Sequence, residues 1–394
     1  MKRSAIDPDR DSPTLPDIRR ARLFLAALVC GTVTSLTLLL MFFGGVKTNF
    51  EEAATFGAQT TSIFAKEGGH PIHCMDSRDA NGCIEGARSR SARNSVLWLG
   101  NSQLHAINQM RLGEMNAPPI LFESLYPRGL DLLTFSQPNA NLQEHYVLFE
   151  YLRKQLPLRL LILSIVFDDL REDGLRDEVA ALTRDEQTSM ALSATDIGRR
   201  LLVISRFVAK DQDTAGIAQT IQERAELTLN GWLEEQNSLW KVRPMVRGKV
   251  FYGLYVARNA LFGIKATSKR KIIQGRYNDN LAALAAILNA ARREGIEVVL
   301  YIAPLRGGME IPYDSGEYAR FKSDIQRLAR LHNARYANLE ALVPNELWDS
   351  GTESGANEVP DADFMHFQAG GHKVLAAKLE QLVTDSLANL DIRP

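Results

Sequence analysis

The sequence predicts an α/β protein: a three-layer α/β/α, doubly wound parallel sheet with a helical insertion, preceded by an N-terminal transmembrane helix. Short apolar runs bounded by turn residues alternate with helical patterns from about Val96 to Leu387. Between residues 174 and 275 this alternation stops, because long helical patterns replace the strands. Ahead of the domain, Leu23 to Val46 carries no charged residue, and at ~1.5 Å per residue it is long enough to cross the ~30 Å hydrocarbon core of a membrane.

These patterns divide the chain into a cytoplasmic tail (1–22), a transmembrane anchor (23–46), a membrane-proximal connector (47–93) and an α/β domain (94–394) with its helical insertion at about 174–275. Arg19, Arg20 and Arg22 lie just before the apolar span. The positive-inside rule therefore predicts a cytoplasmic N-terminus in a single-pass membrane protein, with the domain on the exported side. A cleaved signal peptide is the alternative, but it would have a shorter apolar region.

Cysteine use agrees with export. Cys30 lies in the apolar span, which leaves Cys74 and Cys83 as the two cysteines of the exported part. A local disulfide between them is expected in an oxidising compartment. A metal site that combines these cysteines with His70 and His73 is the alternative, although the spacing matches no common zinc pattern.

The elements of the domain follow in order. Expected strands are Val96–Leu99, Leu130–Phe135, Leu158–Phe167, Glu297–Pro304 and a short one near Ala334–Tyr336. Expected helices start after Ser102, run from the turn at 136–141 to about Tyr151, and cover Asn280–Glu294, Glu317–His332 and 370–389. Within the insertion, Pro244–Ile264 mixes aromatic with basic residues, which fits either an interfacial amphipathic helix or a core-facing helix with one solvated side.

Composition excludes several function classes. The net charge is −1, so no electrostatic footprint for nucleic acid is present. No P-loop, internal repeat or zinc-spaced Cys/His cluster is found, and no metal or other cofactor is expected.

Two short motifs carry the chemistry. Leu99-Gly100-Asn101-Ser102-Gln103 follows the first apolar run, which places Ser102 on the turn at the carboxyl end of a buried strand, where open α/β sheets hold their active sites. Near the other end, Asp363 precedes His366 by three residues. A carboxylate that orients an imidazole, which in turn reaches a serine, makes a nucleophilic triad. The alternative is that Ser102 caps a helix and His366 is a core histidine.

The order of these blocks resembles the SGNH (GDSL-like) hydrolase superfamily from about Val96 to Leu387, with Gly-Asn-Ser-Gln in place of Gly-Asp-Ser. The resemblance implies a flavodoxin-like sheet and a serine acyl-enzyme. It also implies an oxyanion hole made of the serine N–H, a glycine after the second strand and an asparagine after the third.

The chain departs from that pattern in two places. Asn139 stands where the glycine is expected, and Asp168 where the asparagine should be. A charged carboxylate would repel an oxyanion. Asp168 is therefore protonated, or it points away while Asn139, Asn141 or Gln103 supplies the donor, or it caps the following helix together with Asp169. Asn101, beside the serine, completes the set of candidate oxyanion or substrate-binding residues.

With its single anchor, the chain is similar to membrane-anchored SGNH-like proteins of envelope modification, namely the D-alanyl transfer protein of the teichoic acid pathway and the alginate O-acetylation proteins. That similarity implies transfer of an acyl group, acetyl by preference, onto a cell-envelope polysaccharide, with a multi-spanning membrane acyltransferase as partner. A general carboxylester hydrolase and a catalytically silent binding or assembly subunit remain the alternatives.

Overall fold

The computed structural model describes residues 31, 60–75, 77–216, 269–348 and 363–388. The strands are β1 (Thr60–Ser62), β2 (Lys66–Glu67), β3 (His70–Pro71), β4 (His73–Cys74), β5 (Ser95–Asn101), β6 (Ala106–Asn108), β7 (Asp131–Gln137), β8 (Leu158–Ile165), β9 (Glu297–Ile302) and β10 (Arg335–Asn338). The α-helices are α3 (Ser77–Ser89), α4 (Ala117–Leu125), α5 (Leu142–Gln155), α6 (Asp177–Leu182), α7 (Glu186–Ser193), α8 (Asp196–Gly216), α11 (Gln274–Arg293), α12 (Ser315–Leu331) and α13 (Ala369–Leu387).

The central sheet has six parallel strands in the order β10-β9-β8-β5-β7-β4. Without β4, the five strands follow the doubly wound order 2-1-3-4-5 of flavodoxin-like folds. The order reverses between β5 and β8, and ligands bind at such a switch point, outside the carboxyl ends of the strands.

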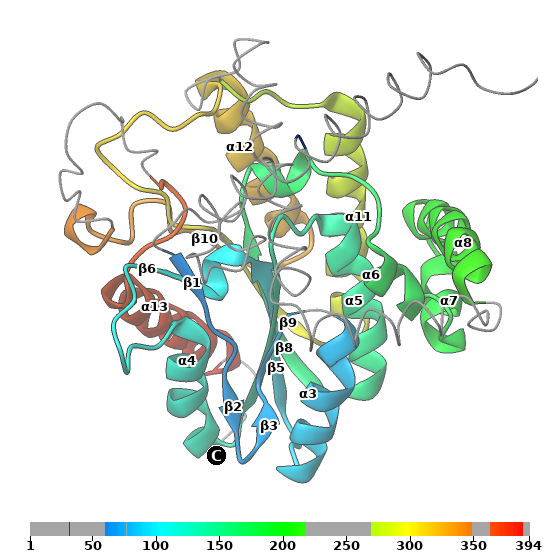
Figure 1. The fold of residues 1–394 in the computed structure, drawn as a ribbon, viewed down its shortest axis with the longest axis horizontal. Coiled ribbons are helices and arrows are strands. Elements are labelled where there is room, and N and C mark those ends of the chain that lie inside the picture. The colour runs from blue at the N-terminus through cyan, green and yellow to red at the C-terminus, as the bar shows by residue number, and fades with distance from the viewer. Residues whose placement is uncertain (1–30, 32–59, 76, 217–268, 349–362, 389–394) are drawn as a thin grey trace, which may run out of the picture.

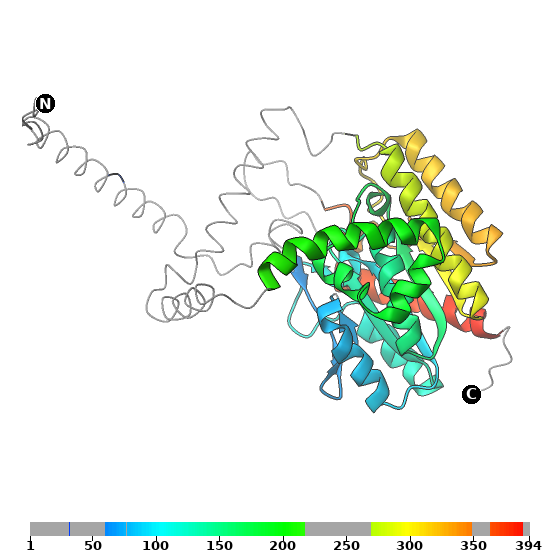
Figure 2. The same ribbon diagram turned by 90° about the vertical axis from the view of Figure 1, so that its right-hand side faces the viewer.

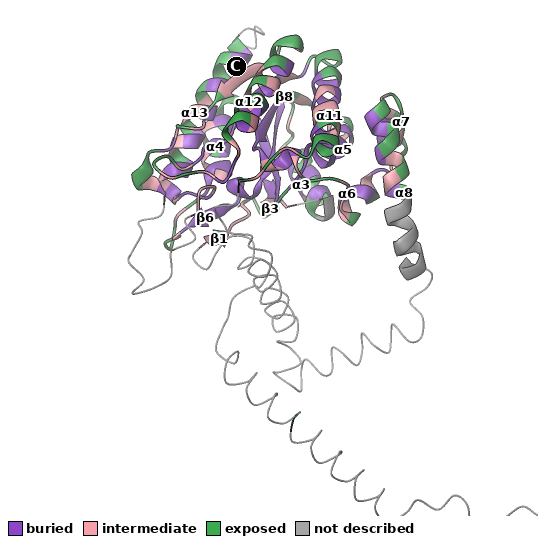
Figure 3. Ribbon diagram, turned by 90° about the horizontal axis from the view of Figure 1, so that it is seen from above, coloured by how far each residue is buried: buried purple, intermediate pink, exposed green. Residues whose placement is uncertain are grey.

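Alternate residues along each strand feed two separate cores. On β5, Val96 and Trp98 pack with α4 and α13, whereas Leu97 and Leu99 pack with α3, α5, α11 and α12. Both faces of the sheet are therefore covered, as a parallel sheet requires. Figures 1 and 2 show the sheet between the two helical layers, with α6, α7 and α8 beyond α5, and Figure 3 shows the strands buried at the centre.

Two expectations differ from the structure. No helix follows Ser102: a 3₁₀ turn, Ser102–Leu104, leads into β6, which pairs antiparallel with β1. The strand pairing and the bond from Asn108 N to Phe367 O (3.1 Å) satisfy the backbone here in place of a helix. The expected connector is also not separate, because its residues 60–93 supply β1 to β4 and α3, and β4 forms one edge of the central sheet.

Some expectations lie outside the described residues: the tail 1–22, Pro244–Ile264 and, apart from Gly31, the apolar span Leu23–Val46. Among the helices that are described, none combines the length and the apolar character needed to cross a membrane. The described part of the insertion, up to residue 216, consists of α6, α7 and α8.

Candidate active site

Ser102 lies directly after β5, at the switch point of the sheet. The turn is tight because Gly100 has no side chain: a Cβ there would come within 2.6 Å of the Leu104 side chain and 3.1 Å of Ser164. Asn101 caps the turn, since its side-chain oxygen accepts the backbone N–H of Gln103 at 3.0 Å. The chain therefore reverses within a few residues and presents Ser102 at the carboxyl edge of the sheet.

The structure brings Ser102, His366 and Asp363 together from opposite ends of the domain. Ser102 Oγ lies 2.9 Å from His366 Nε2, and His366 Nδ1 lies 2.7 Å from Asp363 Oδ2. A carboxylate can only accept, so the Nδ1 proton points at Asp363 and Nε2 is left to accept the serine proton. The serine, the base and the orienting carboxylate are thus hydrogen-bonded in the order that nucleophilic catalysis requires.

Asp363 is held in its charged form. Burial favours its neutral form, but the charge of His366, its hydrogen bond and two backbone N–H groups outweigh burial, so the pKa of Asp363 lies below its usual value. Those N–H groups belong to Met365 and His366, and each donates to Asp363 Oδ1 at 2.9 Å. The same bonds fold the Asp363–His366 segment into a compact turn.

Gln103 fastens this turn to the sheet. Its side chain is fully buried, and its Nε2 donates to the carbonyl oxygens of Pro304, just beyond β9, at 2.8 Å and of Met365 at 2.7 Å. Met365 immediately precedes His366. The amide of Gln103 is therefore committed to holding the histidine, and Gln103 is not an oxyanion donor.

Asn101 is also committed. Its amide nitrogen donates to Asp169 at 3.3 Å, and Asp169 accepts the Val166 backbone N–H at 2.9 Å. Burial raises the pKa of Asp169 well above its usual value, although both hydrogen bonds oppose the shift. This pair ties the serine turn to the end of β8 instead of facing substrate.

Asp168, expected at the position of the family asparagine, points into a different network. Arg171 donates to it at 2.9 Å, the Tyr313 hydroxyl donates at 3.0 Å, and Arg270 pairs with it as well. All three partners are hydrogen-bond donors, so they occupy the oxygens of the Asp168 side chain. Of the three alternatives for Asp168, the structure favours the one in which it points away.

Among the amides considered for the oxyanion hole, Asn139 alone has no hydrogen bond in the described part of the chain. Asn141 caps α5 through a reciprocal pair with Glu144, and its Nδ2 donates to Gly174 O at 3.0 Å. Asn139 is exposed two residues beyond β7, with φ at 52°. Glycine and asparagine adopt this left-handed conformation most readily, so an asparagine can take the backbone conformation expected of a glycine at this position.

A second serine–histidine cluster lies at the end of the neighbouring strand β7, and no sequence motif predicts it. Ser136, at the end of β7, contacts His73 Nε2 at 2.6 Å and His105 Nδ1 at 2.8 Å. Burial, followed by the charge of His372, lowers the pKa of His73 to about 3. Burial and neighbouring histidines also hold the pKa of His105 well below its usual value. Both imidazoles are neutral at physiological pH.

The cysteines form a disulfide between β4 and α3, with Cα atoms 6.6 Å apart. Since both sulfurs are bonded to each other, neither is available as a metal ligand with His70 or His73. In the described ranges, no group of three or more His, Cys, Asp or Glu side chains is arranged to hold a metal.

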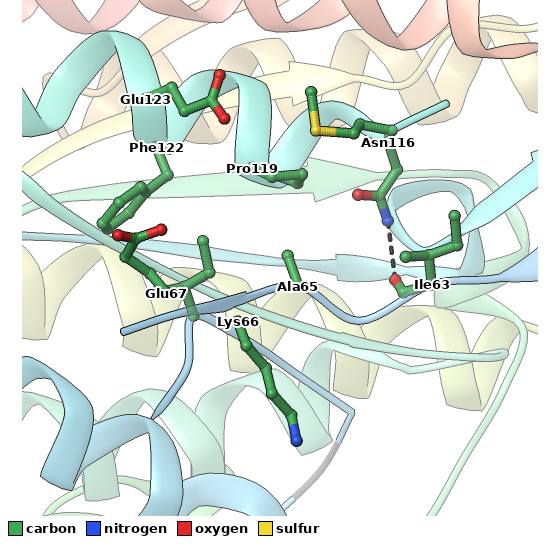
Figure 4. A pocket seen from close by; sticks show the side chains of 10 residues that line it. Ile63, Ala65, Lys66, Glu67, Asn116, Pro119, Phe122 and Glu123 are labelled. Carbon is green, nitrogen blue, oxygen red and sulfur yellow. Dashed lines mark hydrogen bonds between the residues drawn. The ribbon is translucent and has the colours of Figure 1, made fainter. Parts of the chain in front are cut away.

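A cavity of about 210 Å³ lies away from the triad. It is bounded by the Ile63–Glu67 segment on one side and by α4 on the other, where Pro119 and Phe122 point into it (Figure 4). It contains none of the triad residues. The candidate active site is therefore located by the side-chain geometry of the triad and not by this cavity.

No known family profile matches the chain, and no curated protein matches it. Several solved structures are similar. A putative acylhydrolase from Bacteroides fragilis is 11% identical over 76% of this chain and 95% of its own, with a TM-score of 0.36. A putative arylesterase from Agrobacterium tumefaciens is 10% identical over 75% and 100%, with a TM-score of 0.37. An acetylxylan esterase from Geobacillus stearothermophilus is 9% identical over 73% and 92%, with a TM-score of 0.35.

Proposed function

We propose that the chain is a serine-dependent esterase or acyltransferase of SGNH type, and that Ser102 carries the acyl group. The observation that supports this most is the unbroken chain of hydrogen bonds from Ser102 Oγ through His366 to Asp363. A serine hydroxyl becomes a competent nucleophile only when a positioned base takes its proton.

The reaction follows from that geometry. His366 Nε2 takes the Ser102 proton as Oγ bonds to the ester carbonyl carbon, and Asp363 stabilises the imidazolium. The carbonyl oxygen becomes an oxyanion. We assign its donors to the Ser102 N–H, which at the first position of the 3₁₀ turn has no acceptor within that turn, and to Asn139. Collapse breaks the ester C–O bond, the leaving alkoxide receives the proton from His366, and the acyl group remains on Ser102.

Water or a sugar hydroxyl then completes the cycle. His366 Nε2 takes the acceptor's proton while its oxygen attacks the acyl carbon, and Ser102 recovers its proton as the C–O bond to it breaks. We propose transfer of an acyl group, acetyl by preference, to a cell-envelope polysaccharide at the bacterial inner membrane. The apolar span and the Cys74–Cys83 disulfide support an exported, anchored protein, and a multi-spanning acyltransferase is the expected partner that supplies the acyl group.

Turnover of p-nitrophenyl acetate by the full chain tests the proposal. Wild type should hydrolyse it, and Ser102→Ala should not. A matched control is Ser136→Ala, which removes the other histidine-bonded serine and should leave turnover intact. Hydrolase and transferase are separated by adding an acetyl-free polysaccharide: acetyl appearing on the polymer at the expense of free acetate indicates transfer, whereas acetate alone indicates hydrolysis. No turnover by wild type would favour the silent binding subunit.

A further inference from the structure

The loop between β6 and α4, residues Gln109–Met115, carries two of the large hydrophobic side chains that are exposed in the described part of the chain. Leu112 is fully exposed, and Met115 is 39% exposed. The other large exposed hydrophobic side chains in the described ranges, Tyr126, Met190, Val203, Ile273 and Leu331, each stand alone on a different element. Single exposed hydrophobic residues need no explanation, but two on one short loop do.

The backbone holds Leu112 outward. Glu114 N bonds to Arg111 O at 3.2 Å, which closes a turn with Leu112 and Gly113 at its tip. Gly113 has φ at 84°, a left-handed conformation that glycine permits. Glu114 turns its carboxylate back to the Arg111 backbone N–H at 2.7 Å. The tip therefore presents a leucine beside an arginine whose side chain pairs with no carboxylate among the described residues.

The apolar surface continues from this tip toward α4. Met115 also lines the 210 Å³ cavity, together with Ile63, Pro119 and Phe122 (Figure 4). Leu112 protrudes beside Arg111, which has no carboxylate partner among the described residues. The hollow behind them has apolar walls at Ile63, Pro119 and Phe122, and Lys66, Glu67 and Glu123 also line it. A protruding leucine beside an arginine suits an interface between lipid headgroups and acyl chains.

The chain enters the described domain next to this loop. Thr60 is paired with Asn108, so β1 begins beside the residue that leads into the loop (Figure 1). The apolar span ends at Val46, 60 − 46 = 14 residues earlier, a stretch that reaches at most about 50 Å when fully extended. The described domain therefore begins with a strand that pairs directly with the residues leading into the Leu112 loop.

The same loop is joined to the catalytic segment. Asn108 N bonds to Phe367 O at 3.1 Å, and Gln368 Nε2 donates to Gln109 Oε1 at 2.8 Å. Phe367 directly follows His366. A surface that binds this loop would therefore be held in a fixed orientation relative to His366.

We propose that residues Gln109–Met115 rest on the surface of a membrane containing anionic phospholipid, with Leu112 among the acyl chains and Arg111 at the headgroup phosphates. The triad then faces the bilayer, and the acyl donor reaches Ser102 from the membrane side. This inference rests on the anchored form of the proposed function.

The test uses the full chain in a Cys30→Ser background, reconstituted into vesicles of phosphatidylethanolamine and phosphatidylglycerol. A fluorescent label on Leu112→Cys should be quenched at least about twofold by nitroxide lipid, because the side chain would lie at the acyl boundary. The matched control is Leu331→Cys, an exposed leucine at the end of α12, on the opposite edge of the sheet; its label should not change. The proposal is overturned if nitroxide lipid quenches the two labels equally, or if the full chain does not remain with the vesicles.

Leu112→Asp separates this inference from the reaction itself. In vesicles the variant should lower the turnover of p-nitrophenyl palmitate dissolved in the bilayer severalfold, yet hydrolyse soluble p-nitrophenyl acetate like wild type. If wild type does not hydrolyse soluble p-nitrophenyl acetate, the proposed reaction itself is refuted. If the label at Leu112 is unquenched, the membrane contact is refuted, whatever Leu112→Asp does to turnover in vesicles.

Discussion

Two serine–histidine groups lie near the carboxyl edge of one sheet, and only one has the features of a catalytic site. Ser102 and Ser136 follow adjacent strands, β5 and β7, and each contacts an imidazole nitrogen within 2.9 Å. His366 Nδ1 is bonded to the charged Asp363, whereas His73 Nδ1 has no partner in the described structure. Burial lowers the pKa of His73 to about 3, so it would be a very weak base. The carboxylate, and not the serine–histidine contact, marks the nucleophile.

The largest expected effect follows from replacing each serine in turn. Ser102→Ala should lower kcat/KM for an activated ester by about 10³-fold or more, because no other group supplies the nucleophile. Ser136→Ala should stay within a few-fold of wild type in activity but cost roughly 1–3 kcal/mol of stability, since it leaves buried histidines without their partner. Ester kinetics and thermal unfolding check the pair. The assignment fails if the two variants exchange these phenotypes.

Replacing the carboxylate of Asp363 should make the Ser102–His366 pair resemble the Ser136–His73 pair, which has no carboxylate partner among the described residues. Asp363→Asn keeps the shape but no longer fixes the tautomer of His366, and a fall of roughly 10²–10⁴-fold in kcat is expected. In wild type the pKa of Asp363 is lowered on folding, so its stabilising contribution is complete above the unfolded pKa of about 3.9 and disappears as pH falls through the folded value. Thermal unfolding measured against pH should show this acid loss in wild type and less of it in Asp363→Asn. Curves of identical shape would contradict the charge assigned to Asp363.

Gln103 tests whether the position of His366 matters for catalysis, because it holds the histidine without touching the reacting atoms. Gln103→Met retains length and burial but loses both bonds from Nε2, and kcat should fall about tenfold with little change in KM, since a misplaced base affects the transition state more than substrate binding. The downfield proton resonance of the His366–Asp363 bond should broaden or vanish in the variant. A sharp, unshifted resonance together with reduced kcat would indicate that Gln103 acts in some other way.

The smallest effect is expected at Asp168, whose carboxylate lies at the same edge but is bound by arginines. Asp168→Asn should change ester turnover by less than about twofold and lower stability by about 1 kcal/mol or less, because the ion pairs are partly exposed. Kinetics and thermal unfolding of this one variant suffice. A tenfold rise in turnover would instead place Asp168 against the oxyanion.

The sequence predicted β5, β7, β8 and β9 because each is rich in apolar residues. It predicted the triad because its members lie in two short motifs. It did not predict β6, since the pairing with β1 depends on residues that are distant in the chain. For the same reason the roles of Asn101 and Gln103 became visible only when Asp169, Pro304 and Met365 were brought beside them. The sequence shows that a residue has a side-chain amide, but not whether that amide faces substrate or donates to a backbone carbonyl.

Whether Ser102 is the nucleophile is tested most directly by the site of covalent labelling by a fluorophosphonate, which reacts only with a serine activated by its base. Peptide mapping of the labelled full chain should find one phosphonate, on Ser102, and none in His366→Ala, in which Ser102 is intact but no longer has its base. A label on Ser136 or another serine, or an undiminished label on Ser102 in His366→Ala, would contradict the account.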